Sequence, residues 1–203
     1  MKYIIMCGCN GPEPKHLTVV EGEELVARTI RLLRQEGVED ISISTNNPVF
    51  EKFELPILRH NNSYYTDEHG YWVDGFYPTE EPACYVFGDV FFSEEAINKI
   101  VTTETEDVMF FASAPPFPPS YPKEWAEPFA FKVVNQKHFR EAIEEVKALH
   151  NRGRFTRHPI AWELWQVVAH TPINCIHLNY TVINDYTCDV DREDQVNQWR
   201  DKQ

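Results

Sequence analysis

Short apolar runs alternate with amphipathic helical patterns along the chain, and this alternation constrains the fold more than any other feature of the sequence. Continuous apolar runs that lie between turn residues are typical of strands buried on both faces of a parallel sheet. Such runs cover residues 2–7, 41–45, 83–87, 108–112 and 129–134. Helical periodicity covers about 24–35, 93–101, 136–149 and 160–168. The pattern predicts an α/β fold with three layers, α/β/α, around a mostly parallel mixed sheet.

Weaker signals predict five further elements. They are an extended piece at 17–20, a short helix at 48–53, short strands at 55–58 and 176–182, and a closing helix at 191–199. Hydrophobic residues make up 42% of the 203 residues, which is enough for a real core. Because no repeat or linker interrupts the alternation, we expect a single domain over residues 1–203.

The charge balance excludes some classes of partner. The formal net charge is −13 and the sequence pI is about 5.0. Nucleic acids and anionic membrane surfaces need a basic face, so we expect neither as a partner. No apolar run approaches the length of a membrane span, and we expect a cytoplasmic protein that is a monomer or a homodimer. The five cysteines are odd in number, which favours reduced thiols over a disulfide framework.

A glycine turn follows the first apolar run and leads to a lysine. The turn starts at Gly8 and the lysine is Lys15. Backbone N–H groups approach an anion closely at glycine, and a lysine adds a positive charge, so the segment is a candidate phosphate site. It is not a P-loop, because the spacing of Gly8 and Gly11 does not fit that motif. The alternative is an ordinary strand-to-helix connection with a surface lysine.

Two acidic segments follow apolar runs. Asp89 stands just after the run 83–87, where open α/β sheets bind ligands at the carboxyl ends of their strands. Asp189 and Asp191 alternate, so in extended backbone they share one side of the chain. Mg²⁺ takes one or two carboxylates together with water and substrate phosphates. The alternative for Asp89 and Asp191 is a helix-capping role.

These features occur in an order that resembles the GT-A-like nucleotidyltransferases of the MobA-like NTP transferase superfamily. Those enzymes activate sugar phosphates or small alcohol phosphates with CTP or UTP. The resemblance is good over residues 3–47, partial to residue 101 and nearly absent from 112 to 175. It rests on Pro14-Lys15-His16-Leu17, Glu21-Gly22-Glu23-Glu24-Leu25, the segment 37–47, Phe87-Gly88-Asp89-Val90 and Cys188-Asp189-Val190-Asp191.

The resemblance implies a Rossmann-like, GT-A-type sheet and an Mg²⁺-dependent transfer of a nucleotidyl group from an NTP, CTP or UTP, to a small phosphorylated substrate, with release of pyrophosphate. It implies catalytic roles for Lys15 and Asp89. The nucleotide-binding candidates are Cys7, Gly8, Cys9, Lys15, Asn46, Asn61, Asn62 and Ser63. The metal candidates are Asp89, Asp191 and Asp189, and the acceptor-binding candidates are Tyr64, Trp72, Asp74 and Trp125.

The chain departs from the family pattern at the phosphate loop. The family loop carries an arginine that grips the triphosphate, whereas here the segment 8–13 has none and adds Glu13. Lys2 or Arg59 is a candidate substitute. This departure leaves open a GT-A glycosyltransferase that uses a nucleotide-sugar donor, or a catalytically degenerate nucleotide- or carbohydrate-binding protein. The proline-rich segment 114–122 is a candidate lid over the acceptor, with a static surface loop as the alternative.

Overall fold

The computed structural model describes residues 1–8, 14–60, 71–115, 126–155, 157–173 and 178–190. The lid segment and the closing helix expected from the sequence lie wholly or mostly outside these ranges. So do seven of the candidate site residues: Cys9, Asn61, Asn62, Ser63, Tyr64, Trp125 and Asp191.

A seven-stranded sheet forms the centre of the protein, in the order β10-β8-β9-β6-β1-β4-β5. β9 runs antiparallel to both of its neighbours, and the other pairings are parallel. The sheet is therefore mixed and mostly parallel, as the sequence predicts. Its strands are β1 (Lys2–Met6), β4 (Ile41–Thr45), β5 (Ile57–Arg59), β6 (Ala83–Phe87), β8 (Val108–Ser113), β9 (Pro128–Val133) and β10 (Thr181–Ile183).

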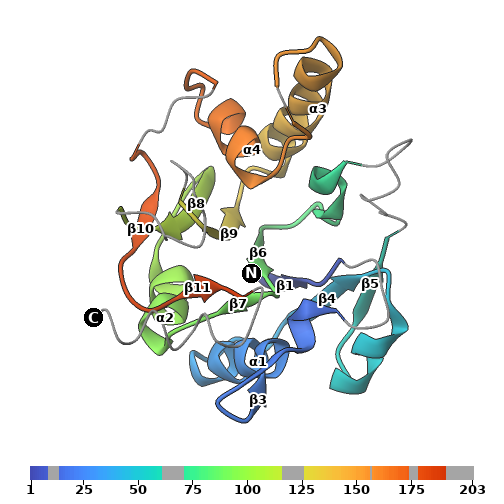
Figure 1. Cartoon of the computed structure of the whole chain (residues 1–203), viewed down its shortest axis with the longest axis vertical. Helices are drawn as coiled ribbons and strands as arrows, with labels where there is room; N and C mark the ends of the chain where they lie inside the picture. The colour runs from blue at the N-terminus through green and yellow to red at the C-terminus, as the bar shows by residue number, and fades with distance from the viewer. Residues whose placement is uncertain (9–13, 61–70, 116–125, 156, 174–177, 191–203) are drawn as a thin grey trace.

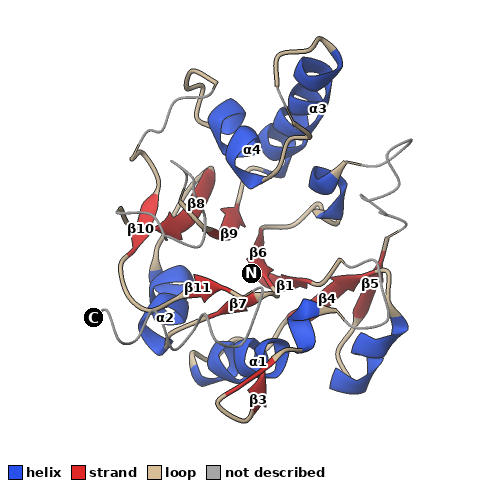
Figure 2. Cartoon of the chain, viewed as in Figure 1, coloured by secondary structure: helices blue, strands red, loops and turns tan. Residues whose placement is uncertain are grey.

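Helices cover both faces of the sheet and complete three layers (Figures 1 and 2). α1 (Leu25–Gln35) and α2 (Glu94–Thr102) lie on one side, and α3 (Gln136–Asn151) and α4 (Ala161–Val168) lie on the other. Each helix begins close to where its periodicity predicts. The Ser93 hydroxyl caps α2 by accepting a hydrogen bond from the Ala96 N–H at 2.8 Å.

Short elements connect the strands to the helices. They are the 3₁₀ helices η1 (Lys15–Leu17), η2 (Pro48–Phe53) and η3 (Trp72–Gly75), the hairpin of β2 (Val19–Val20) with β3 (Glu23–Glu24), and the ribbon of β7 (Val90–Phe91) with β11 (Cys188–Asp189). The hairpin turn places Glu21 and Gly22 at positive φ, 55° and 82°.

Three expectations for secondary structure need correction. β5 begins at Ile57 rather than at residue 55, and β10 begins at Thr181. Of the strand expected over 176–182, residues 176 and 177 lie outside the described ranges and residues 178–180 are not strand. Leu178 is 60% exposed, and the Tyr180 hydroxyl donates to the Ser113 carbonyl at 3.0 Å. The ribbon of β7 with β11 is absent from the sequence prediction, because two-residue strands have too few positions to show a period.

The core beneath α3 is built from aromatic rings. The ring of Phe76, which follows η3, lies 5.1–6.4 Å between centroids from five others. These belong to Trp72, Tyr85, Phe87, Phe131 and Phe139. Edge-to-face packing of this kind adds to the gain from burial. Phe76 therefore joins η3 to the sheet and to α3.

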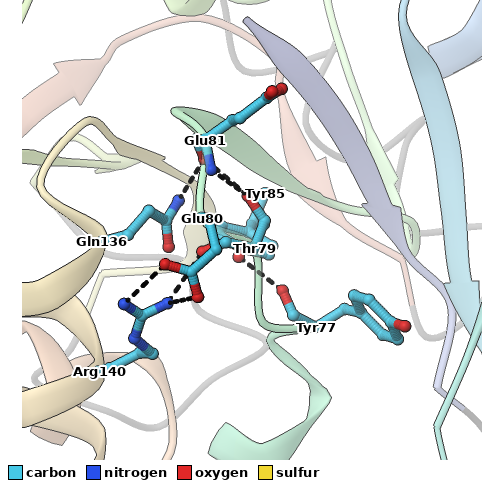
Figure 3. Close-up of polar contacts among 7 residues, drawn as sticks. All are labelled: Tyr77, Thr79, Glu80, Glu81, Tyr85, Gln136 and Arg140. Carbon is cyan, nitrogen blue, oxygen red and sulfur yellow. Dashed lines mark hydrogen bonds and ion pairs between the residues drawn. The ribbon is translucent and has the colours of Figure 1, made fainter.

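Hydrogen bonds of polar side chains join residues 77–81, just before β6, to α3 and to β6 itself (Figure 3). Arg140 donates to the Thr79 carbonyl at 3.0 Å and pairs with Glu80, while the Gln136 side chain donates to the Glu81 carbonyl at 3.1 Å. The Tyr85 hydroxyl donates to the Tyr77 carbonyl at 2.7 Å. These bonds satisfy backbone carbonyls that β6 leaves unpaired before it begins.

The described helices offer no candidate for a membrane crossing, since none is both long and apolar enough.

Replacing Phe76 with alanine should destabilise the protein by about 3–5 kcal/mol, because it empties a fully packed aromatic site. Urea unfolding measures the change in free energy. Leu178→Ala is the matched control, since its side chain is exposed and its loss should leave the unfolding midpoint nearly unchanged. Equal midpoints for Phe76→Ala and the wild type would contradict this account of the core.

Candidate functional site

The carboxyl ends of the parallel strands gather the candidate residues at one edge of the sheet. β1 leads into Cys7 and Gly8, β4 into Asn46, and β6 into Asp89. Since β9 runs antiparallel to its neighbours, its N-terminal end lies at the same edge of the sheet, and Glu127 is the residue just before β9. The topology therefore brings together residues from distant parts of the sequence.

Close packing of two strand ends requires a glycine at position 88. The Gly88 N–H donates to the Met6 carbonyl at 3.0 Å. A Cβ atom at this position would lie 2.7 Å from the Cys7 sulfur and 2.8 Å from the Met6 carbonyl oxygen, and both distances are too short for a carbon atom. The absence of a side chain at Gly88 thus allows the chain to turn here and sets the position of Asp89.

The Lys15 ammonium lies between two carboxylates. Its Nζ is 2.8 Å from Oδ2 of Asp89 and 3.4 Å from Oδ1 of Asp189. The side chains are 39%, 23% and 15% exposed for Lys15, Asp89 and Asp189, so the group is partly open to solvent. The two carboxylates are the kind of ligand that a divalent cation takes, and the ammonium is the kind of partner that phosphate takes.

The ribbon of β7 with β11 places Asp189 beside Asp89. Asp189 pairs with Val90, the residue after Asp89, and the Val190 N–H donates to the Asp89 carbonyl at 3.0 Å. The side chain of Glu127, which is only 4% exposed, accepts a hydrogen bond from the Asp189 N–H at 3.0 Å. Backbone hydrogen bonds therefore hold the two carboxylates in register although a hundred positions separate them in the sequence.

A second set of hydrogen bonds attaches residues 185–187, just before β11, to the N-terminus of α2. The Ser93 hydroxyl donates to Asp185 at 2.7 Å, and the Ser93 N–H donates to the Thr187 hydroxyl at 3.0 Å. The Thr187 N–H donates to Asp185 at 2.7 Å. Asp185 is thus a structural residue that anchors the late acidic segment at the N-terminus of α2.

Electrostatics keep the Asp89 carboxyl ionised. Burial tends to raise its pKa, but the positive charge of Lys15 opposes burial and leaves the pKa below its usual value. The pKa of His16 is lowered, mainly by burial, since the ring is 5% exposed. His16 is therefore neutral near pH 7, and Lys15 carries the positive charge of this group.

Three further nucleotide-binding candidates, Cys7, Gly8 and Asn46, differ in how far solvent reaches them. The Cys7 N–H donates to the Ser44 carbonyl at 2.8 Å, and the thiol is buried against the position of Gly88. Gly8 is exposed and lies beside the ring of His60, whose nearest atom is 3.6 Å from where a Cβ of Gly8 would be. Asn46 is half-buried at the end of β4.

The two described acceptor candidates have structural contacts of their own. Trp72 packs edge-to-face on Phe76 and Phe87. Asp74 accepts a hydrogen bond from the Tyr71 N–H at 3.1 Å and pairs with Lys147 of α3. Nothing in these contacts places either residue next to Asp89, so their acceptor role stays a prediction from the sequence.

The donor set fits Mg²⁺ in its chemistry. The described residues contain no group of three or more His, Cys, Asp or Glu side chains arranged to hold a metal ion. Mg²⁺ does not require such a cage, because one or two carboxylates with water and substrate phosphates suffice. Asp89 and Asp189 would supply those carboxylates, and Asp191 lies outside the described residues.

Sequence reasoning missed several residues near the site. Glu127 stands in a segment without a motif, and only the antiparallel course of β9 brings it to Asp189. The sequence also gives no signal for His16 and His60, since a single histidine carries no metal-ligand or catalytic spacing. The sequence does contain one signal for the ribbon strand β7, because the apolar pair Val90-Phe91 follows the turn at Asp89.

Comparison with solved structures shows the same fold in nucleotidyltransferases. A protein from Bacillus anthracis assigned as a glucose-1-phosphate thymidylyltransferase is similar at a TM-score of 0.58 and 15% identity, covering 99% of this chain and 94% of that one. The inositol-1-phosphate CTP transferase from T. maritima gives 0.57 and 12%, covering 98% and 96%. The 4-diphosphocytidyl-2C-methyl-D-erythritol synthase from Anaerococcus prevotii gives 0.54 and 11%, covering 99% and 96%.

No protein-family model matches the chain, and no curated protein matches it. At these identities, the structural likeness concerns the fold. It confirms the expected α/β/α architecture, and the fold of this chain is that of the sugar-phosphate nucleotidyltransferases to which its motifs are similar.

Replacing Gly88 with alanine should destabilise the protein by about 1–3 kcal/mol, because the new Cβ overlaps the Cys7 sulfur and the Met6 carbonyl. Urea unfolding measures this effect. Gly8→Ala is the control, since its Cβ would meet nothing closer than 3.6 Å. If both variants unfold at the wild-type midpoint, the strand ends are not packed as described.

Proposed function

We propose that this protein is an Mg²⁺-dependent nucleotidyltransferase that transfers a nucleotidyl group from CTP or UTP to a sugar phosphate or a small alcohol phosphate. The observation that carries the proposal is the position of Lys15 between Asp89 and Asp189, at the carboxyl edge of the sheet. The fold shared with proteins named for such transfers supports the reaction class.

The reaction joins two phosphates and requires positioning more than a covalent nucleophile. A phosphate oxygen of the acceptor attacks the α-phosphorus of the NTP in line, and the bond from that phosphorus to the bridging oxygen breaks, so that pyrophosphate leaves. Negative charge develops on the phosphate oxygens in the transition state. Lys15 neutralises that charge by binding the phosphates, which requires no proton transfer.

The remaining residues orient the nucleotide and the metal. The exposed backbone at Gly8 would bind the phosphates, and Asn46 would contact the nucleotide from the end of β4. Asp89 and Asp189 would hold the metal, and the Glu127 side chain fixes the backbone of Asp189 by accepting a hydrogen bond from its N–H. When bound, Mg²⁺ supplies charge neutralisation and a fixed geometry for the phosphates. Of the two candidate substitutes for the arginine of the family loop, Lys2 begins β1 at the end away from Gly8, and Arg59 ends β5 at the carboxyl edge of the sheet.

The direct test is release of pyrophosphate from each of the four NTPs in the presence of Mg²⁺ and a pool of sugar phosphates and small alcohol phosphates. We expect release with CTP or UTP that depends on the acceptor. No release from any NTP would contradict the proposal, and nucleotide binding without release would indicate a binding protein on the same fold.

Asp89→Asn should lower the rate of pyrophosphate release by about 100-fold or more, because a neutral amide no longer holds the cation beside the phosphates. The fold should survive, since the side chain lies at a strand end and is partly exposed. Asp40→Asn is the control: this exposed carboxylate pairs with Lys2 at 4.0 Å. A wild-type rate in Asp89→Asn, with wild-type thermal unfolding, would remove Asp89 from the mechanism.

A further inference from the structure

The Lys15 ammonium lies in the space that a cation shared by Asp89 and Asp189 would need. Its Nζ is within 3.4 Å of one oxygen of each carboxylate. A divalent cation bound to the same two oxygens would lie within a few ångströms of the ammonium, where repulsion between the two charges is strong. Both cations therefore cannot occupy this position together.

The lysine is built so that its charged end is able to move while its backbone stays in place. The Lys15 carbonyl accepts a hydrogen bond from the Thr18 N–H at 3.0 Å, which closes η1. The side chain is 39% exposed, and a lysine stem carries several rotatable bonds. Glu127 and the ribbon of β7 with β11, by contrast, fix the backbone of Asp189. The ammonium is thus the part of this group that is able to shift.

We propose that Lys15 and a divalent cation compete for Asp89 and Asp189, and that nucleotide phosphates end the competition by drawing the ammonium away from the carboxylates. This inference rests on the proposed function, since it concerns the order in which that site fills. Phosphates give Lys15 a second set of oxygen partners and at the same time add ligands for the cation. Nucleotide and cation binding are then coupled, each strengthening the other.

The competition predicts that one substitution changes the two affinities in opposite directions. Removal of the Lys15 charge should strengthen binding of the bare cation while it weakens binding of the nucleotide. A lysine whose ammonium lay far from both carboxylates would leave the affinity for the bare cation nearly unchanged, because solvent and salt screen distant charges.

The experiment measures Mn²⁺ binding to the full chain without nucleotide, by water-proton relaxation and by the rise in melting temperature with Mn²⁺ concentration. Lys15→Met keeps the length of the side chain and removes its charge. Lys52→Met is the matched control, because Lys52 is similarly exposed at 43% and is also paired with a carboxylate, that of Glu24. Titration of each protein with CTP and with UTP, in the absence of metal, measures its affinity for the nucleotide.

We expect Lys15→Met to bind Mn²⁺ about tenfold more tightly than the wild type, as fits the loss of one nearby positive charge, and Lys52→Met to match the wild type. Lys15→Met should also bind CTP and UTP more weakly. An unchanged or weaker affinity for Mn²⁺ in Lys15→Met overturns the inference, as does an absence of Mn²⁺ binding in both proteins. Because this measurement involves no turnover, its failure is distinguishable from an absence of pyrophosphate release.

Discussion

The ion pairs of Lys15 with Asp89 and Asp189 are the interaction on which the candidate site depends. They bring together the loop after β1, the turn after β6 and the ribbon strand β11. Each carboxylate alone would be an ordinary residue at a strand end. Together with the ammonium they concentrate charge at the carboxyl edge of the sheet, where α/β folds bind their ligands.

Much of the surrounding structure serves to hold these three side chains in register. Gly88 lets β6 end against Met6 and Cys7, and the hydrogen bond from the Asp189 N–H to Glu127 ties β11 to the beginning of β9. Such contacts keep carboxylates of like charge close together, which is costly without the lysine. In a chain of net charge −13, the Lys15 ammonium gives an anionic substrate a local positive partner.

The sequence predicts the sheet and the four helices, because these rest on local patterns that a single chain displays. It also singles out Lys15 and Asp89, whose side chains the structure places 2.8 Å apart and whose roles stay a prediction. Apolar runs mark buried strands, and a glycine turn marks the strand end that carries Asp89. The same reasoning left Asp189 and Asp191 as competing candidates and gave no role to Glu127. Their positions depend on the two-residue ribbon strands and on the antiparallel course of β9, which are long-range pairings that no local period records.

The most direct measurement for this account is a crystal structure of the protein with Mn²⁺ and a nonhydrolysable CTP analogue, in which anomalous scattering locates the metal. The account predicts Mn²⁺ bound directly to Asp89 and Asp189, with the Lys15 ammonium moved onto a phosphate. A structure in which Lys15 still lies between the two carboxylates, with the nucleotide and Mn²⁺ bound elsewhere, would contradict it.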